Sequence, residues 1–270
     1  IVQNDTTICE GDSLVLVASG TQNFATGSSH LSGTLNNGLV GYWPFNGNAN
    51  DESGNGNDGN LTNGATYTTD INGNVSSAVL CPGLINLPVG SYFSQNNEWS
   101  YSFWTRKDAN RGHNVIQVSE INGNYAVSAG WTSLNGSLND NGVPRIYSSN
   151  TNCGSLVTVS QCIAENGIWM HLSFIYENNT IKIFKNGEYC SELPQAFSSG
   201  TINCLNPNSS MWIGGDVYGG AIEYYNGAFD DFRFWNRPLS ANEVDQLFNG
   251  TNFNYSWSPG GETTSSITVL

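Results

Sequence analysis

The sequence has few basic residues and little charge of any kind. Its 270 residues include 8 Lys and Arg against 22 Asp and Glu, which gives a formal net charge of −14. A chain this acidic repels phosphate backbones, so we expect no nucleic-acid partner. No apolar run approaches the roughly 18 residues that a membrane-spanning helix needs. The sequence therefore predicts no direct membrane insertion.

Signatures of hydrolytic chemistry are also missing. Retaining glycoside hydrolases need two carboxylates about 5–5.5 Å apart, and the strand pattern Glu-x-Asp-x-x-Glu that supplies them does not occur. Glu243 and Asp245 are two residues apart on a predicted helix, where they would not face each other. No Gly-x-Ser-x-Gly motif occurs either. We expect a non-catalytic protein, and a polysaccharide hydrolase or lyase is the alternative.

Cysteine spacings typical of zinc sites are absent too. The chain has 6 Cys and no Cys-x-x-Cys pair, which favours disulfides and an oxidising compartment. We predict the disulfides Cys153–Cys162 and Cys190–Cys204, because each pair is close in sequence and spans a turn-rich segment. Cys9 and Cys81 are left over, and we expect Cys81 to be free.

What the sequence does have is a period-two alternation of apolar and polar residues. The segment "WSYSFWTRK" (99–107) places Trp99, Tyr101, Phe103 and Thr105 on one face of a strand. Similar patterns occur at 13–19, 114–120, 124–131, 169–177, 180–193, 210–215 and 227–239. Only "SANEVDQLF" (240–248), which opens with a capping box, predicts a helix. Many strands with one helix predict an all-β fold, an antiparallel β-sandwich.

One loop, "NGNANDESGNGNDG" (46–59), is rich in oxygen donors. Calcium takes roughly six to eight oxygen ligands, and mixtures of carboxylate, amide and carbonyl oxygens suit it. Gly54 and Gly56 permit tight bends that turn carbonyl groups inward. Two interpretations are open. The loop binds calcium, or it is a solvated loop held by turns in which Asn and Asp side chains bond to the backbone.

The two ends of the chain differ from its middle. Residues 4–20 and 253–270 resemble pieces of the immunoglobulin-like or PKD-like modules that repeat in bacterial surface proteins. We predict that 1–36 and 251–270 form a split, partial immunoglobulin-like module, and that 37–250 is a large domain inserted into it. The chain would then be part of a larger multidomain protein. The alternative is that both ends decorate a single domain.

Several segments of residues 38–250 carry a second resemblance. The segment "GLVGYWPFNGNANDESGNGNDGNLTNGATYTTDINGN" (38–74) resembles the opening strand and loop of the laminin-G-like (concanavalin-A-like) jelly-roll superfamily in its bacterial secreted form. "WSYSFWTRK" is similar to its central strand, and "GAFDDFRFWNRPLSANEVDQLF" (227–248) to its closing strand and helix. The resemblance implies a jelly-roll β-sandwich with a structural Ca²⁺ shared between the loop and the closing strand. The ligands that it implies are Asp51 with Asp230 or Asp231, one of the Asp pair, plus backbone carbonyls. Asn46 and Gly56 of the oxygen-rich loop complete the candidate set.

Two loop segments could bind a ligand. A sugar ring has an apolar face and polar edges, so an exposed aromatic ring with polar neighbours suits it. The segments 130–150 and 214–227 combine such residues. The alternative to ligand binding, for any single Tyr in them, is that its ring caps the core of the sandwich. The predicted ligand-binding residues are Trp131, Arg145, Tyr147, Asp216, Tyr218, Tyr224 and Tyr225.

Together these features predict a non-catalytic extracellular module that recognises a carbohydrate or another surface ligand. We expect it on a secreted or cell-surface bacterial protein. A structural or adhesin segment without a glycan site is the first alternative.

Overall fold

The computed structural model describes residues 33–88, 98–108, 162, 165–178, 180–194, 210–218 and 221–249. It also gives the backbone of the strands at 14–17, 114–119, 125–132, 143–147, 157–158 and 266–269. The statements below concern these residues.

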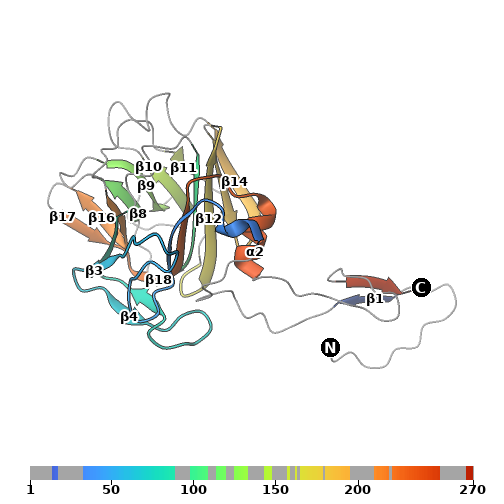
Figure 1. The fold of residues 1–270 in the computed structure, drawn as a ribbon, viewed down its shortest axis with the longest axis horizontal. Coiled ribbons are helices and arrows are strands. Elements are labelled where there is room, and N and C mark those ends of the chain that lie inside the picture. Colours follow the sequence, from blue (N-terminus) through green and yellow to red (C-terminus); the bar gives the residue numbers. More distant parts are fainter. Residues whose placement is uncertain are drawn as a thin grey trace.

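Two antiparallel sheets make up the body of the molecule (Figure 1). The eight-stranded sheet has the order β14 (Glu188–Pro194), β13 (Thr180–Lys185), β12 (Trp169–Glu177), β7 (Trp99–Lys107), β18 (Gly227–Trp235), β5 (Ala78–Leu80) and β4 (Thr66–Thr68), and β2 (Leu39–Trp43) also pairs with β18. The seven-stranded sheet has the order β11 (Val157–Thr158), β10 (Val143–Tyr147), β9 (Tyr125–Thr132), β8 (Asn114–Ser119), β15 (Ser210–Ile213), β6 (Leu84–Leu87) and β3 (Asn60–Thr62). A separate hairpin joins β16 (Gly215–Tyr218) to β17 (Ala221–Tyr224). The predicted all-β, antiparallel sandwich is confirmed.

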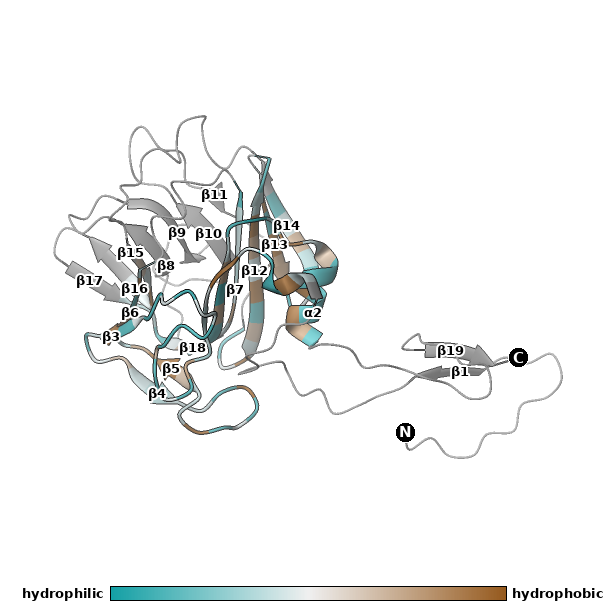
Figure 2. Cartoon of the chain, viewed as in Figure 1, coloured by the Kyte–Doolittle hydropathy of each residue, from teal (hydrophilic) through white to brown (hydrophobic). Residues whose placement is uncertain are grey.

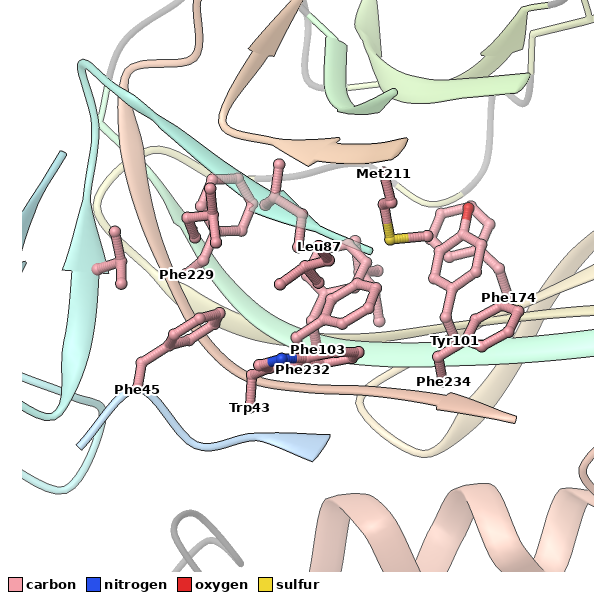
Figure 3. Close-up of a cluster of buried hydrophobic side chains, with 14 of the residues drawn as sticks. Trp43, Phe45, Leu87, Tyr101, Phe103, Phe174, Met211, Phe229, Phe232 and Phe234 are labelled. Atoms are coloured by element: carbon pink, nitrogen blue, oxygen red, sulfur yellow. The ribbon is translucent and has the colours of Figure 1, made fainter. Parts of the chain in front are cut away.

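The core between the sheets is mainly aromatic (Figure 3). Tyr101 belongs to this core, with its ring centroid 5.0 Å from that of Phe174 and 6.1 Å from that of Phe232. The seven-stranded sheet contributes aliphatic and thioether side chains such as Leu87 and Met211. The alternation predicted for β7 is therefore the alternation between this core and the outer face of the eight-stranded sheet.

The outer face of the eight-stranded sheet is covered by the short 3-10 helix η1 (Gly33–Asn36) and by α2 (Ala241–Asn249). A second apolar cluster joins Leu35 of η1 and Leu247 of α2 to Trp235 of the sheet. Figure 2 shows both hydrophobic and hydrophilic positions along α2, as an amphipathic helix requires. The capping box is present, since the Ser240 amide donates to Glu243 Oε2 (2.8 Å) and the Glu243 amide to Ser240 Oγ (3.3 Å). No helix in the described part of the chain is long and apolar enough to span a membrane.

The two ends of the chain meet in a two-stranded ribbon (Figure 1). The strand β1 (Leu14–Val17) pairs antiparallel with β19 (Ser266–Val269). Whether this ribbon belongs to an immunoglobulin-like module is not tested, and the split module stays a prediction. Residues 33–36, placed in that module above, pack on the sandwich. Leu35 is buried, and its carbonyl accepts a hydrogen bond from Trp235 Nε1 (2.7 Å).

The disulfide prediction was wrong. Cys162 pairs with Cys190 of β14, with a Cα–Cα distance of 5.8 Å. The prediction joined cysteines close in sequence, whereas the fold brings together two residues 28 positions apart. Cys81 is free, as expected, and its burial raises the thiol pKa to about 12. The other cysteines, Cys9, Cys153 and Cys204, lie outside the described residues.

Candidate functional site

The seven-stranded sheet has one face in the core and one face turned away from it. On β15, Met211 and Ile213 are fully buried in the core, while Trp212 between them is only partly buried. On β6, Ile85 and Leu87 are buried in the same core, and Asn86 between them is partly exposed. Neighbouring residues of a strand point to opposite faces. Trp212 and Asn86 therefore lie on the open face.

The strand register relates positions on this face of the sheet across six strands. Asn86 pairs with Asn60 on one side and with Trp212 on the other. Trp212 pairs with Gln117, Gln117 with Ser128, and Ser128 with Tyr147. Residues directly opposite each other share a face. We call this set the polar row, and it consists of Asn60, Asn86, Trp212, Gln117, Ser128 and Tyr147.

The polar row combines two aromatic residues, Trp212 and Tyr147, with amide and hydroxyl groups. Adjacent strands lie about 4.8 Å apart, so the five steps of the row span roughly 24 Å. Each amide offers both a donor and an acceptor, which matches the hydroxyl groups of a carbohydrate. Sequence reasoning missed Trp212, Asn60, Asn86 and Gln117 because it searched loops. The alternation in "SMWIGG" (210–215) was the available signal for Trp212, since it places Trp212 opposite two core residues.

The predicted ligand residues in 130–150 separate onto two faces. Arg145 pairs with Gly130 and lies two positions from Tyr147, so both belong to the open face. Trp131 pairs with Pro144, at a register position of the other face of the sheet. The strand register thus places Trp131 and Arg145 at positions of opposite faces of the sheet, and their role in ligand binding stays a prediction.

The predicted residues in 214–227 also separate. Asp216 and Tyr218 belong to β16, which lies beside β8. Tyr224, at the end of β17, is partly exposed. Tyr225 is 1% exposed, its hydroxyl is 3.1 Å from Thr105 Oγ1, and its ring centroid is 4.9 Å from that of Phe229. Tyr225 caps the core, so a sugar-stacking role for it is wrong.

The oxygen-rich loop is held by its own hydrogen bonds. Asp51 Oδ1 accepts from the amides of Tyr42 and Ser53, and Asp51 Oδ2 from the amide of Asn57, all at 2.9 Å. Asp58 Oδ1 accepts in turn from the Asp51 amide (2.9 Å). The other predicted ligands in the loop are Asn46, whose carbonyl accepts from Asn48 Nδ2, and Gly56, which has a positive φ of 75°. Asn and Asp turns thus account for much of the composition of the loop.

The two adjacent carboxylates of β18 have different surroundings. Asp231 has a positive φ of 56° at a bulge, and its Oδ2 accepts from Arg233 Nη1 at 2.6 Å. Neither carboxylate oxygen of Asp230 has a hydrogen-bond partner of good geometry among the described residues. Burial, and then the negative charges of Asp231 and Asp70, raise the pKa of Asp230 well above its usual value. Asp230 is therefore the carboxylate with unused oxygens.

The fit of these residues to calcium is partial. The described residues contain no group of three His, Cys, Asp or Glu side chains that could hold a metal. The Asp51 carboxylate is bonded within its own loop, and Asp231 is paired with Arg233. Among the predicted ligands that the structure describes, Asp230 is buried and both of its carboxylate oxygens lack a hydrogen-bond partner. Calcium binding is not tested by this arrangement and stays a prediction.

The fold agrees with the family comparison. A family model described as the concanavalin A-like lectin/glucanases superfamily matches residues 82–245, more than half of the chain. The chain belongs to this superfamily, and the predicted jelly roll is confirmed. A search of curated proteins gave no match.

Solved structures with a similar fold include binding domains and an enzyme. Domain 4 of AbnA, a GH43 extracellular arabinanase from Geobacillus stearothermophilus, was solved with arabinotriose. It has a TM-score of 0.54 and 18% identity, with 77% of this chain and 97% of that chain covered. The binding domain of botulinum neurotoxin DC, solved with SialylT, has a TM-score of 0.55 and 15% identity, with 81% and 53% covered. The Trypanosoma rangeli sialidase has a TM-score of 0.57 and 15% identity, with 80% and 33% covered.

At these identities the likeness shows the fold alone. The chain spans nearly all of the arabinanase domain, about half of the toxin domain and a third of the sialidase.

Proposed function

We propose that this chain is a non-catalytic carbohydrate-binding module, and that its ligand lies along the polar row. The observation that carries the proposal is Trp212, a partly exposed aromatic residue placed by register between Asn86 and Gln117. An aromatic ring stacks on the apolar face of a sugar, and flanking amides bond to its hydroxyl groups. The arabinanase domain that was solved with arabinotriose supports this function by analogy of fold.

The ligand that fits the polar row is a neutral glycan. The row contains no Asp, Glu, Lys, Arg or His, and the whole chain carries a formal charge of −14. An acidic sugar would approach against this field. Arg145, near one end of the row, adds hydrogen-bond donors but does not reverse the overall charge. We therefore expect neutral oligosaccharides to bind more tightly than sialylated ones.

The test is a glycan array, followed by calorimetry on a neutral oligosaccharide that binds. Trp212→Ala should weaken affinity by about tenfold or more, as expected for a central aromatic contact. Trp212→Phe, which keeps a ring, should retain most of the affinity, and both variants should keep the melting temperature within a few degrees. Equal binding by wild type and Trp212→Ala would refute the polar row as the site. An array without any hit would favour the structural or adhesin alternative.

The proposal also excludes hydrolysis and cleavage by elimination. A screen of neutral and acidic polysaccharides should show no shortening of the chains by the protein. Depolymerisation of any of them would support the enzyme alternative and contradict the non-catalytic assignment.

The proposed setting is extracellular, on a secreted or cell-surface bacterial protein, as one module of a longer chain. The Cys162–Cys190 disulfide supports an oxidising compartment. Secretion of the full-length protein, followed with an antibody against this module, tests the setting. Retention inside the cell would contradict it.

We further propose a structural Ca²⁺ ligated by Asp230, with oxygen donors of the neighbouring loops completing its shell. Its support is the buried carboxylate without bonded partners. A ligand that binds only the folded state stabilises it by about 2.7 kcal/mol at a hundredfold excess over Kd. EDTA should therefore lower the melting temperature of the wild type but not that of Asp230→Asn. An unchanged melting temperature in EDTA, with no calcium by elemental analysis, would rule the ion out.

A further inference from the structure

A second cluster of polar side chains lies inside the molecule, on the outer face of the eight-stranded sheet. The register places Ser173 of β12 opposite Ser102 of β7, and Ser102 opposite Arg233 of β18. In the next row, His171 lies opposite Trp104. We call Ser102, Ser173, His171 and Arg233 the inner polar cluster. It lies on the far side of the eight-stranded sheet from the core that the two sheets share, and is distinct from the polar row.

The inner polar cluster is completely enclosed. Ser102 and Ser173 are 0% exposed, and His171 and Arg233 are 1% exposed. The ring of Phe248, at the C-terminal end of α2, covers one side, with its centroid 6.2 Å from that of His171 and 5.6 Å from that of Trp104.

Most hydrogen-bonding atoms of the cluster have no partner among the described residues. These atoms are Ser102 Oγ, Ser173 Oγ, both ring nitrogens of His171, and Nε and Nη2 of Arg233. Buried polar groups in native proteins are almost always hydrogen-bonded, to protein or to ordered water. Ser100, on the same face of β7, follows that rule. Its hydroxyl donates to the Arg237 carbonyl (2.9 Å) and accepts from the Leu239 amide (3.0 Å).

The spacing of the cluster suits a bridging molecule of about the size of water. Opposite residues on paired antiparallel strands have Cα atoms roughly 4.5–5.5 Å apart. Ser102 Oγ and Ser173 Oγ both lack a hydrogen-bond partner, so the two hydroxyl groups do not bond to each other. Two hydrogen bonds of about 2.8 Å through one water cover such a gap. Phe184 of β13, opposite Ser173, bounds the cluster on its other side.

The charges around the cluster favour a neutral guest. Arg233 is already paired with Asp231 (2.6 Å), and its guanidinium lies over the Tyr42 ring at 4.3 Å. An added anion would approach the carboxylates of Asp231 and Asp230, and an added cation would approach Arg233. Burial and the charge of Arg233 lower the pKa of His171 to about 3, so its ring is neutral and offers one donor and one acceptor.

We propose that the inner polar cluster is a binding site for ordered water, which bridges Ser102, Ser173, His171 and Arg233 beneath α2. The bridging waters connect three neighbouring strands, β12, β7 and β18, through their side chains. Ser102 and Ser173 have small side chains that leave space beneath α2. In this proposal their hydroxyl groups bind the water that occupies that space.

The test is a high-resolution crystal structure of the full chain, with one crystal soaked in sodium bromide. The expected result is at least one ordered water within about 2.7–3.2 Å of Ser102 Oγ and of Ser173 Oγ or Arg233 Nε. The Ser100 hydroxyl serves as the internal control and should bond only to protein. Ser173→Val fills the space with a branched apolar side chain and should displace this water. Ser173→Ala serves the same purpose if the valine variant does not fold, and should lose the water contacts of that hydroxyl.

Two outcomes would overturn the proposal. One is direct bonding of both serine hydroxyls to protein groups. The other is an anomalous bromide peak among these side chains, which would identify the guest as an anion.

Discussion

At the scale of single residues, position within a strand decides the role of each aromatic side chain. Trp212 and Tyr225 are only thirteen positions apart, yet Trp212 is partly exposed on an open sheet face and Tyr225 is buried against Phe229. Glycine-rich surroundings made Tyr225 look like a loop residue. Its burial shows that turn composition around a residue does not determine which way its side chain packs.

A conservative change tests the structural role of Tyr225. Tyr225→Phe removes the hydroxyl that contacts Thr105, while Thr105 still donates to the Ala228 carbonyl (3.0 Å). We expect the free energy of unfolding in urea to fall by about 1 kcal/mol, with glycan binding unchanged. Tyr224→Phe, at a partly exposed position, is the control and should change stability by less than about 0.5 kcal/mol. Reduced glycan affinity in Tyr225→Phe without loss of stability would contradict this role.

At the scale of elements, α2 is fixed to η1 by one ion-pair network. Arg237 Nη2 donates to Glu243 Oε1 (2.7 Å) and to the Thr34 carbonyl (2.7 Å). The Thr34 hydroxyl also donates to Glu243 Oε1, at 2.6 Å. We call Thr34, Arg237 and Glu243 the corner clamp. It joins residues from opposite ends of the sandwich sequence.

The corner clamp makes the free energy of unfolding depend on pH. Burial alone would raise the pKa of Glu243, but hydrogen bonds from Arg237, Thr34 and Ser240 lower it from the ordinary 4.5 to about 2. The stabilisation is present above pH 4.5 and is lost as the pH falls toward 2. We expect a loss of up to about 3 kcal/mol from this group over that range. Urea titrations at several pH values should show a shallower dependence for Glu243→Gln, and identical slopes would contradict the prediction.

The disulfide of β14 gives a second prediction at this scale. Removing the Cys162–Cys190 link, which spans 28 positions, should lower the free energy of unfolding by about 3–4 kcal/mol. A Cys162→Ala, Cys190→Ala double variant tests this by urea denaturation, and Cys81→Ala controls for loss of a free thiol. Peptide mapping without reductant should recover Cys162 joined to Cys190. Recovery of Cys153 joined to Cys162 would contradict the pairing.

The elements themselves were largely predictable, and the site was not. Strands could be predicted because alternation such as that of Trp99, Tyr101 and Phe103 indicates which side chains are buried. The capping box of α2 could be predicted because it depends only on the local spacing of two residues. The polar row is built from six strands, and it exists only once their register is known. Pairings such as Asn86 with Trp212 join residues far apart in the chain, and no local pattern contains that information. The disulfide was missed for the same reason.

At the scale of the whole molecule, the body of the sandwich begins before the predicted boundary at residue 37. Leu35 is 1% exposed in the cluster beneath α2, and Thr34 belongs to the corner clamp. The insertion of this body into a second module remains a proposal. It draws support from the pairing of β1 with β19.

Two fragments test the boundary. Residues 33–249 should fold alone, give a β-sheet circular dichroism spectrum and keep glycan binding. Residues 37–249 lack Leu35, whose full burial is worth about 1.5–3 kcal/mol, and should melt at a lower temperature. Equal melting temperatures would show that η1 is dispensable, and an unfolded 33–249 fragment would contradict the insertion.

The corner clamp also has a mechanical consequence. Thr34 and Glu243 touch, so the polypeptide enters and leaves the sandwich at one corner. When a cell-surface protein is stretched, a force applied through the chain on both sides of this domain acts on the two ends that meet at this corner. Such a force need not pass through the strands of the sheets. The load then falls on a few hydrogen bonds around Arg237, and the face proposed to bind glycan stays unstrained. In an optical trap pulling from residues 33 and 249, we expect a small early extension when the clamp opens, well before the sheets separate, and Arg237→Ala should abolish that first event.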